Sequence, residues 1–290
     1  MNKVDVSLWF DGKAEEAAKF YTSLFKNSEV GRTSYFTKSG EKVSGQKAGA
    51  VLTVEFKIAN LSLVGLNGGP MFKFTPATSL FVWCETEKEI DDLWFNLTAG
   101  GGVRMALDQY PWSKKYGWAT DKFGLDWQLN LAPNAQKIAP AMLFVDKLFG
   151  KGEEALNLYT AVFPDCTIES ISRDESQKSV THSIFKLNEQ DVVLMDGAGN
   201  HGFEFNEAVS LMIYCKNQKE IDHLWDGLIK GGGKASQCGW LKDKFGVSWQ
   251  IVPDFMRDVI YDAGKSEKVM DEMYKMKKLD YQKLKDAYNH

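Results

Sequence analysis

The chain has 290 residues and a formal net charge of -4, a length that allows two domains with a hydrophobic core each. This acidic balance argues against nucleic acid as the main partner, because binding to phosphates needs a basic surface. No apolar run approaches the ~20 residues that span a bilayer, and the N-terminus lacks the apolar core of a signal peptide. We therefore expect a cytoplasmic protein that does not enter a membrane.

The first half of the chain shows one order of elements twice. Alternating and helical apolar patterns predict a strand, a helix and three further strands, which make a βαβββ unit. A flexible loop is predicted in the first unit, through 39–45. The elements of the first unit span 4–10, 14–25, 30–36, 50–58 and 61–66, and those of the second span 79–84, 87–99, 103–107 and a hairpin at 117–130.

The second half repeats this arrangement. The string Gly-Trp-x-x-Asp-Lys-Phe-Gly-x-x-Trp-Gln occurs at 117–128 and again at 239–250, and Glu16 and Trp94 match Glu154 and Trp225. The offset between matched positions drifts along the chain, as loop insertions in a duplicated sequence would cause. We therefore predict a first domain at 1–135, a second at 136–254 and a helical extension at 255–290.

Each repeated string reads as a hairpin with an aspartate that organises its turn. Asp121 and Asp243 are expected to accept hydrogen bonds from nearby backbone N–H groups. The strand that follows the first turn alternates, with Trp127 on an apolar face and Gln128 on a polar face that a purely structural strand would not need.

The four cysteines form no C-x-x-C pair and no zinc-like group with the histidines, which predicts reduced thiols in a reducing compartment. The extension after Pro253 is lysine-rich and amphipathic, but acidic residues are interleaved with the lysines. We expect it to dock on its own domain or on a partner subunit rather than on a membrane.

These motifs carry a family resemblance. The segment Leu8-Trp9-Phe10-Asp11-Gly12, the two hairpin strings and Ile251-Val252-Pro253 resemble the PhnB-like branch of the glyoxalase/bleomycin-resistance (vicinal oxygen chelate) superfamily. Members of this branch are often labelled 3-demethylubiquinone-9 3-methyltransferase-like. The resemblance implies an α+β fold of two tandem domains, each of two βαβββ modules that form a half-open barrel, plus C-terminal helices.

The superfamily often holds a divalent metal between a histidine on a first strand and a glutamate on a last strand. The matching positions of this chain supply no imidazole: Asp5, Ser7, Ser79 and Gln128 in the first domain, and Leu143, Val145, Ser210 and Gln250 in the second. We therefore predict no metal site of that type and no cofactor. A Rossmann-type methyltransferase site is also not predicted, because Gly100 to Gly102 follow a helix and read as its stop.

The face of each sheet that points away from the helices is expected to line a concave pocket. Carboxylates beside indoles are candidate acids or bases, so Glu55 and Asp5 are the candidate catalytic residues, although Glu55 could also be a solvated residue at a rim. Predicted ligand-binding residues are Ser7, Trp9, Ser79, Trp83, Gln128, His182, Tyr214 and Gln250.

Three functional hypotheses follow. The first is a protein that binds a small, partly aromatic organic molecule without a metal. The second is a lyase or isomerase that uses Glu55 or Asp5 as its base. The third is an interaction module in which the tandem chain is the covalent equivalent of a homodimer, and we expect either a monomer or a homodimer in solution.

Overall fold

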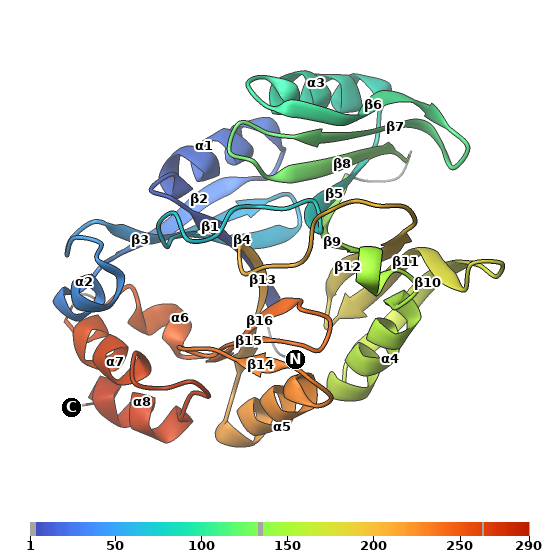
Figure 1. Cartoon of the computed structure of the whole chain (residues 1–290). Coiled ribbons are helices and arrows are strands. Elements are labelled where there is room, and N and C mark those ends of the chain that lie inside the picture. The colour runs from blue at the N-terminus through green and yellow to red at the C-terminus, as the bar shows by residue number, and fades with distance from the viewer. Residues whose placement is uncertain (1–3, 133–135, 263, 290) are drawn as a thin grey trace.

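The computed structural model describes residues 4–132, 136–262 and 264–289. It contains four βαβββ modules in tandem followed by three helices (Figure 1). The first module comprises β1 (Val4–Phe10), α1 (Ala14–Leu24), β2 (Glu29–Tyr35), α2 (Lys38–Ser44), β3 (Val51–Ile58) and β4 (Leu61–Asn67). The second comprises β5 (Thr78–Cys84), α3 (Glu87–Thr98), β6 (Gly102–Tyr110), β7 (Ser113–Thr120) and β8 (Asp126–Leu131).

The second half of the chain repeats this order. The third module comprises β9 (Lys137–Val145), the short 3-10 helix η1 (Asp146–Leu148), α4 (Gly152–Val162), β10 (Cys166–Asp174), β11 (Ser179–Leu187) and β12 (Gln190–Gly197). The fourth comprises β13 (Val209–Cys215), α5 (Gln218–Ile229), β14 (Lys234–Ala235), β15 (Trp240–Lys242) and β16 (Ser248–Pro253). The extension forms α6 (Met256–Val259), α7 (Ser266–Met273) and α8 (Tyr281–Asn289).

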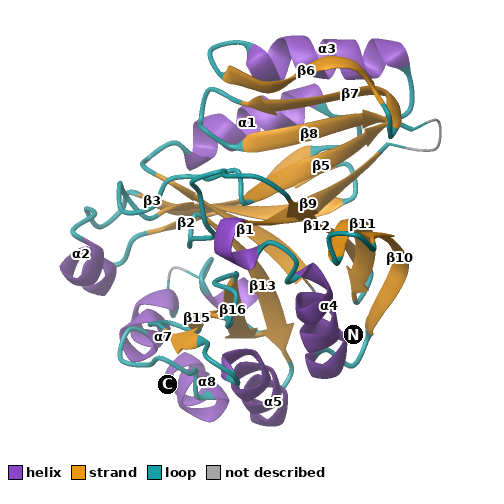
Figure 2. Ribbon diagram, turned by 45° about the vertical axis from the view of Figure 1, so that its right-hand side comes forward, coloured by secondary structure: helices purple, strands orange, loops and turns teal. Residues whose placement is uncertain are grey.

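Two eight-stranded sheets are each built from one module of each half. Sheet A has the order β14-β15-β16-β13-β1-β4-β3-β2, and sheet B has the order β10-β11-β12-β9-β5-β8-β7-β6. They join the halves through antiparallel pairs, β1 with β13 and β5 with β9 (Figure 2). The α+β fold with tandem βαβββ modules is confirmed. The expectation that both modules of one half build one barrel is wrong.

The reason for this exchange lies in the connections between modules. Each module would leave one edge of its first strand without hydrogen-bonding partners, and antiparallel pairing with another module satisfies those backbone groups. The segment 68–77 carries the chain from β4 in sheet A to β5 in sheet B, and the segment 198–208 carries it back from β12 in sheet B to β13 in sheet A. The second and third modules therefore pair with one another in sheet B, and the first and fourth pair in sheet A.

The helices α1, α3, α4 and α5 cover one face of the sheets, and the main hydrophobic core lies there. Buried carboxylates connect the modules within this core. Asp121, in the β7–β8 turn of sheet B, accepts from the hydroxyl of Tyr21 on α1 at 2.7 Å, and Asp243 accepts from Tyr159 on α4 at 2.8 Å. Each half is thus held together through its helices, while each sheet is shared between halves.

Two local expectations were tested by the structure. The predicted turn bonds are confirmed, because Asp121 accepts from the backbone N–H groups of Phe123 and Leu125. The predicted loop at 39–45 is wrong, because α2 forms there with the Thr37 hydroxyl accepting from Gly40 N–H at its N-terminus. Among the described helices, none is long and apolar enough to cross a membrane.

Candidate functional site

The predicted site residues divide between the two sheets. Sheet A carries Asp5, Ser7, Trp9 and Glu55 of the first half together with Ser210, Tyr214 and Gln250 of the second half. Sheet B carries Ser79, Trp83 and Gln128 of the first half together with His182 of the second half. The expectation of one pocket in each half is therefore wrong, because the sheets exchange modules between halves.

The C-terminal helices occupy the face of sheet A that points away from α1 and α5. Apolar residues of α6, α7 and α8 form a cluster with Tyr214 on β13 and Val252 on β16. Figure 1 shows the three helices on this side of the molecule, next to β14–β16. The extension therefore packs on its own chain, as one of the two sequence-based alternatives predicted.

One arginine fastens this extension to the sheet. Arg32 on β2 donates to both carboxylate oxygens of Glu55 at 2.9 and 3.1 Å, and to Asp258 on α6 at 2.8 Å. Its guanidinium also lies 4.2 Å from the ring centre of Tyr261. The sequence analysis missed Arg32, because its partners on the extension, Asp258 and Tyr261, lie more than 200 positions away in the chain.

We expect Arg32→Ala to lower the free energy of unfolding by about 1 kcal/mol, the upper range for an exposed ion pair. The loss should be concentrated in α6 and α7 and should appear as faster amide hydrogen exchange there. Arg173→Ala is the matched control, because Arg173 makes a similar two-pronged contact with Glu153 away from the extension. Equal exchange in α6 for both variants would contradict the anchoring role of Arg32.

A cavity of about 230 Å³ remains beside α6 on this face. Both candidate catalytic carboxylates, Asp5 and Glu55, line it together with Arg257. Asp5 is 2% exposed, and its Oδ2 lies 3.8 Å from Arg257 Nη2. Arg257 in turn lies over the ring of Tyr214, whose pKa burial raises well above its usual value. The carboxylate of Glu55 is held by Arg32, and the carboxylate of Asp5 lies beside Arg257.

The corresponding face of sheet B carries aromatic residues that stay partly exposed. Phe81, Tyr116, Ala139, Ala141 and Val193 form its buried floor. Around them lie partly buried side chains, namely Trp83, Met105, Tyr110, Trp118, Ile184 and Met195. We call this surface the open face of sheet B. Aromatic rings beside small apolar residues are the kind of surface on which flat ligands stack.

A hydrogen-bonded group of three side chains lies on the open face. Gln128 donates to the hydroxyl of Ser79 at 2.9 Å and accepts from the hydroxyl of Tyr116 at 2.7 Å. Burial raises the pKa of Tyr116, so its hydroxyl stays protonated and remains a donor. Sheet A has a related pair, in which Gln250 donates to Ser210 at 2.8 Å.

His182 stands at the side of the open face, with its ring centre 5.8 Å from that of Phe81. Burial lowers the pKa of His182. Because the folded-state pKa lies below the unfolded value of about 6.5, the stabilising contribution of neutral His182 is complete above that unfolded value and is lost as the pH falls from there through the folded-state pKa. We expect His182→Gln to show a smaller decrease in Tm than the wild type between neutral and mildly acidic pH. Parallel Tm curves would contradict this role.

Strand pairing corrects the match between the two halves. Trp9 and Phe10 lie opposite Leu66 and Asn67 of β4, and Leu143 and Phe144 lie opposite Met195 and Asp196 of β12. Trp9 therefore corresponds to Leu143, an offset of 134, whereas the helices that follow correspond with an offset of 138. The four extra residues lie after β9, around η1. The residues that correspond to Asp5 and Ser7 are accordingly Ala139 and Ala141, not Leu143 and Val145 as the sequence alignment predicted.

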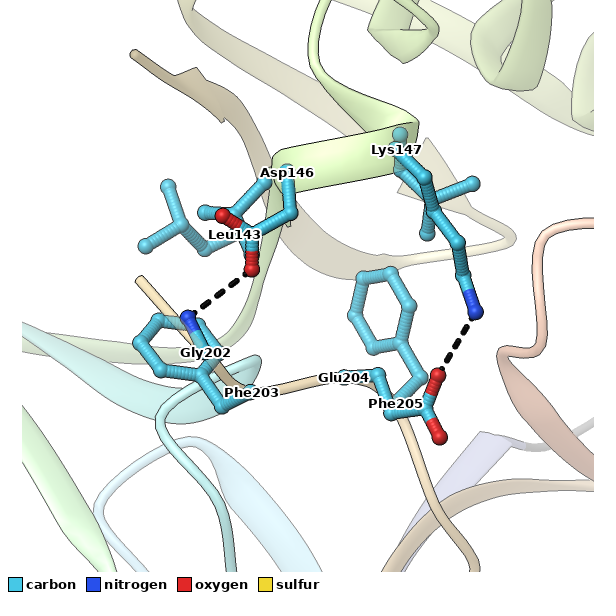
Figure 3. A pocket seen from close by; sticks show the side chains of 9 residues that line it. Leu143, Asp146, Lys147, Gly202, Phe203, Glu204 and Phe205 are labelled. Carbon is cyan, nitrogen blue, oxygen red and sulfur yellow. Dashed lines mark hydrogen bonds and ion pairs between the residues drawn. The ribbon is translucent and has the colours of Figure 1, made fainter. Parts of the chain in front are cut away.

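A pocket of about 300 Å³ opens at the end of β9, where Leu143 lies (Figure 3). The end of β9 and η1 form one wall, and segment 202–205 forms the facing wall. Asp146 accepts from the backbone N–H groups of His201 and Gly202 and thereby holds that segment in place, while Lys147 and Glu204 pair at 2.8 Å. The lining residues are Leu143, Val145, Asp146, Lys147, Leu148, Gly202, Phe203, Glu204 and Phe205.

The donor sets on the two faces do not fit a divalent metal of the superfamily type. The first-strand and last-strand positions carry Ser7, Ser210 and Gln250 on sheet A, and Ala141, Ser79 and Gln128 on sheet B. Hydroxyl and amide groups are neutral and already bond one another. In the described part of the chain, no three His, Cys, Asp or Glu side chains are grouped so that they could hold a metal ion.

Comparison with known proteins agrees with this architecture. The model of the family described as 3-demethylubiquinone-9 3-methyltransferase matches residues 2–130 and again 136–252. The chain belongs to this family. Its two matches confirm the tandem duplication and the resemblance to 3-demethylubiquinone-9 3-methyltransferase-like proteins that the sequence motifs indicated. No protein with a curated description matches the chain.

Two solved structures are similar to parts of this chain. A PhnB protein from Bacillus cereus is 43% identical, covers 45% of this chain and 99% of its own length, and has a TM-score of 0.41. Glyoxalase I from Zea mays is 11% identical, covers 89% of this chain and 95% of its own length, and has a TM-score of 0.58. The maize enzyme shares the tandem fold, and this likeness concerns the fold alone.

Proposed function

We propose that this member of the family binds a small, partly aromatic organic molecule on the open face of sheet B, through neutral side chains and without a metal. One observation supports this proposal above the others. The two sheets are built alike, yet α6–α8 pack on the face of sheet A, while partly exposed aromatic side chains line the face of sheet B.

The two acidic residues beside the extension on sheet A have apolar counterparts on sheet B. By strand pairing, Glu55 corresponds to Ile184 and Asp5 corresponds to Ala139. An apolar floor with one hydrogen-bonding centre, made by Gln128 and Tyr116, suits a flat molecule that carries a single polar group. Such a ligand would stack on Trp83 or Trp118 and bond to the amide of Gln128.

A thermal-shift screen with a library of small aromatic compounds tests this proposal. Compounds that bind should raise the Tm of the wild type by mass action. Ile184→Glu places a charge on the open face and should abolish these shifts. Ile168→Glu is the matched control, because Ile168 lies on neighbouring β10 and is 40% exposed, and it should keep the shifts. The proposal fails if no compound stabilises the wild type, or if Ile184→Glu responds as the wild type does.

A second candidate function is a lyase or isomerase that works in the smaller cavity beside α6. The observation in its favour is that Asp5 and Glu55 line the same cavity. Glu55 is held by Arg32 and Asp5 lies beside Arg257, so both carboxylates are candidates for the base. The test is to incubate the protein in D₂O with each of a panel of small keto acids. NMR then follows the exchange of deuterium into the carbon next to the carbonyl group. Exchange that persists unchanged in Asp5→Asn would remove Asp5 from this role.

A further inference from the structure

A carboxylate is buried at one end of the open face of sheet B. Asp191 on β12 is 2% exposed, and it lies two residues before Val193 of the floor, so both side chains point to this face. Within the described part of the chain, neither of its oxygens accepts a hydrogen bond, whereas the equally buried Asp243 accepts four. A buried carboxylate without hydrogen bonds depends on a cation beside it.

Lys137, the first residue of β9, supplies this cation. Its Nζ pairs with the carboxylate of Asp191, and its side chain is 47% exposed. Lys137 lies directly opposite Trp83 on β5, and the next residue of β9 on the same face, Ala139, belongs to the floor. The amine therefore lies between the aromatic surface and solvent, within reach of a molecule that stacks on Trp83.

A second lysine lies beside this pair. Lys186 on β11 is opposite Asp191 on β12, and its Nζ lies 3.6 Å from a carboxylate oxygen of Glu169. Burial and the charge of Lys186 lower the pKa of Lys137, while the charge of Glu169 acts in the opposite direction. A neighbouring cation favours the neutral amine, which is the form that attacks carbonyl carbon.

The buried carboxylate is particular to sheet B. Lys57 on β3 lies opposite Ser62 on β4, as Lys186 lies opposite Asp191. Sheet A thus has a hydroxyl where sheet B has a carboxylate, so the shared architecture of the two sheets does not require Asp191.

We propose that Lys137 forms an imine with an aromatic aldehyde whose ring stacks on Trp83, and that Asp191 moves the proton in this step. This inference rests on the proposed function, and it names the class of ligand that the open face would take. The carbonyl group of the ligand would lie at Lys137, at the end of the face that also carries Asp191 and Lys186.

The step conserves charge at the site. Asp191 first takes a proton from the ammonium group of Lys137, and the neutral amine then attacks the aldehyde carbon. A C–N bond forms, and a proton passes from nitrogen to oxygen to give a carbinolamine. Protonated Asp191 returns its proton to the hydroxyl, the C–O bond breaks and water leaves. The product is an iminium ion, so Asp191 keeps a cation beside it before and after the step.

Reductive trapping in the full chain tests the proposal. Sodium cyanoborohydride reduces the imine formed with 2-naphthaldehyde to a stable secondary amine, and peptide mapping by mass spectrometry measures the labelling of each lysine. We expect Lys137 to be labelled about tenfold faster than Lys147, an exposed lysine that pairs with exposed Glu204. Lys186→Gln should slow the labelling of Lys137 several-fold, because it removes the neighbouring positive charge. Lys57→Gln is the matched control, because Lys57 takes the same place on sheet A, and it should leave this labelling unchanged.

A second compound separates this proposal from the function on which it rests. 2-Naphthalenemethanol has the same rings but no carbonyl group, so it should raise the Tm of the wild type and of Lys137→Arg alike. If it does so while Lys137 is labelled no faster than Lys147, the imine is overturned and binding to the open face stands. If the alcohol does not raise the Tm and Lys137 is not preferred, both proposals fail.

Two variants complete the test. The imine proposal is also overturned if folded Lys186→Gln is labelled at Lys137 as fast as the wild type is. Preferred labelling of Lys137 that persists in Ile184→Glu would show a reactive amine that needs no ligand on the open face, and it would overturn the proposal as well.

Discussion

Replacing Asp243 by alanine should lower the free energy of unfolding by about 4 kcal/mol, the largest effect that we expect of a single substitution. Asp243 is 3% exposed and accepts four hydrogen bonds. Its donors are the backbone N–H groups of Phe245 and Val247, the indole of Trp249 and the hydroxyl of Tyr159. Each buried donor that loses its acceptor costs about 1 kcal/mol or more.

Urea unfolding followed by circular dichroism measures this effect. Asp243→Asn keeps one acceptor oxygen but turns an amide N–H₂ towards Trp249, so its loss should be intermediate. Asp92→Ala is the control, because Asp92 is an exposed helix residue paired with Lys88, and it should change stability by less than about 0.5 kcal/mol. A loss below about 1 kcal/mol for Asp243→Ala would show that the buried carboxylate does not organise the turn.

The second large effect is expected when the chain is divided. Residues 1–135 contain β1 and β5, whose partners β13 and β9 belong to 136–290. Either half alone would therefore expose the backbone edges and side chains of two central strands, and unpaired edges favour association. We expect neither half to be a folded monomer, whereas co-expression should give a one-to-one complex with the circular dichroism spectrum of the intact chain.

Size-exclusion chromatography with light scattering distinguishes the outcomes of the division experiment. The co-expressed halves should elute with the mass of the intact chain. Each half produced by itself should be insoluble or should form dimers, in which a second copy supplies the missing strand partners. A stable folded monomer of 1–135 would show that the exchange of modules between sheets is not needed for folding. The intact chain should be a monomer if the tandem repeat replaces a dimer.

The candidate site was predictable only in part. Alternation along β1, β5, β8 and β13 correctly placed Ser7, Ser79, Gln128 and Tyr214 on the strand faces away from the main core, because the period of two is a local property. The Gln128–Ser79 and Gln250–Ser210 bonds each join the first and last strands of one module, and the sequence analysis had grouped these residues as the positions that match the superfamily's metal ligands. Arg32 and Arg257 were missed, because they act across more than 200 residues of chain.

The sequence by itself determined the four modules, the helix-covered faces and the aspartates that hold the turns, because apolar period and turn chemistry act over a few residues. Only the tertiary structure decided which modules share a sheet. All four present a similar first strand, and alternation along a strand does not specify its neighbour. That choice brings α6–α8 onto sheet A and leaves sheet B open. The same strand pairing shows that Leu143 stands where the other half has Trp9, a relation that the four extra residues after β9 had hidden.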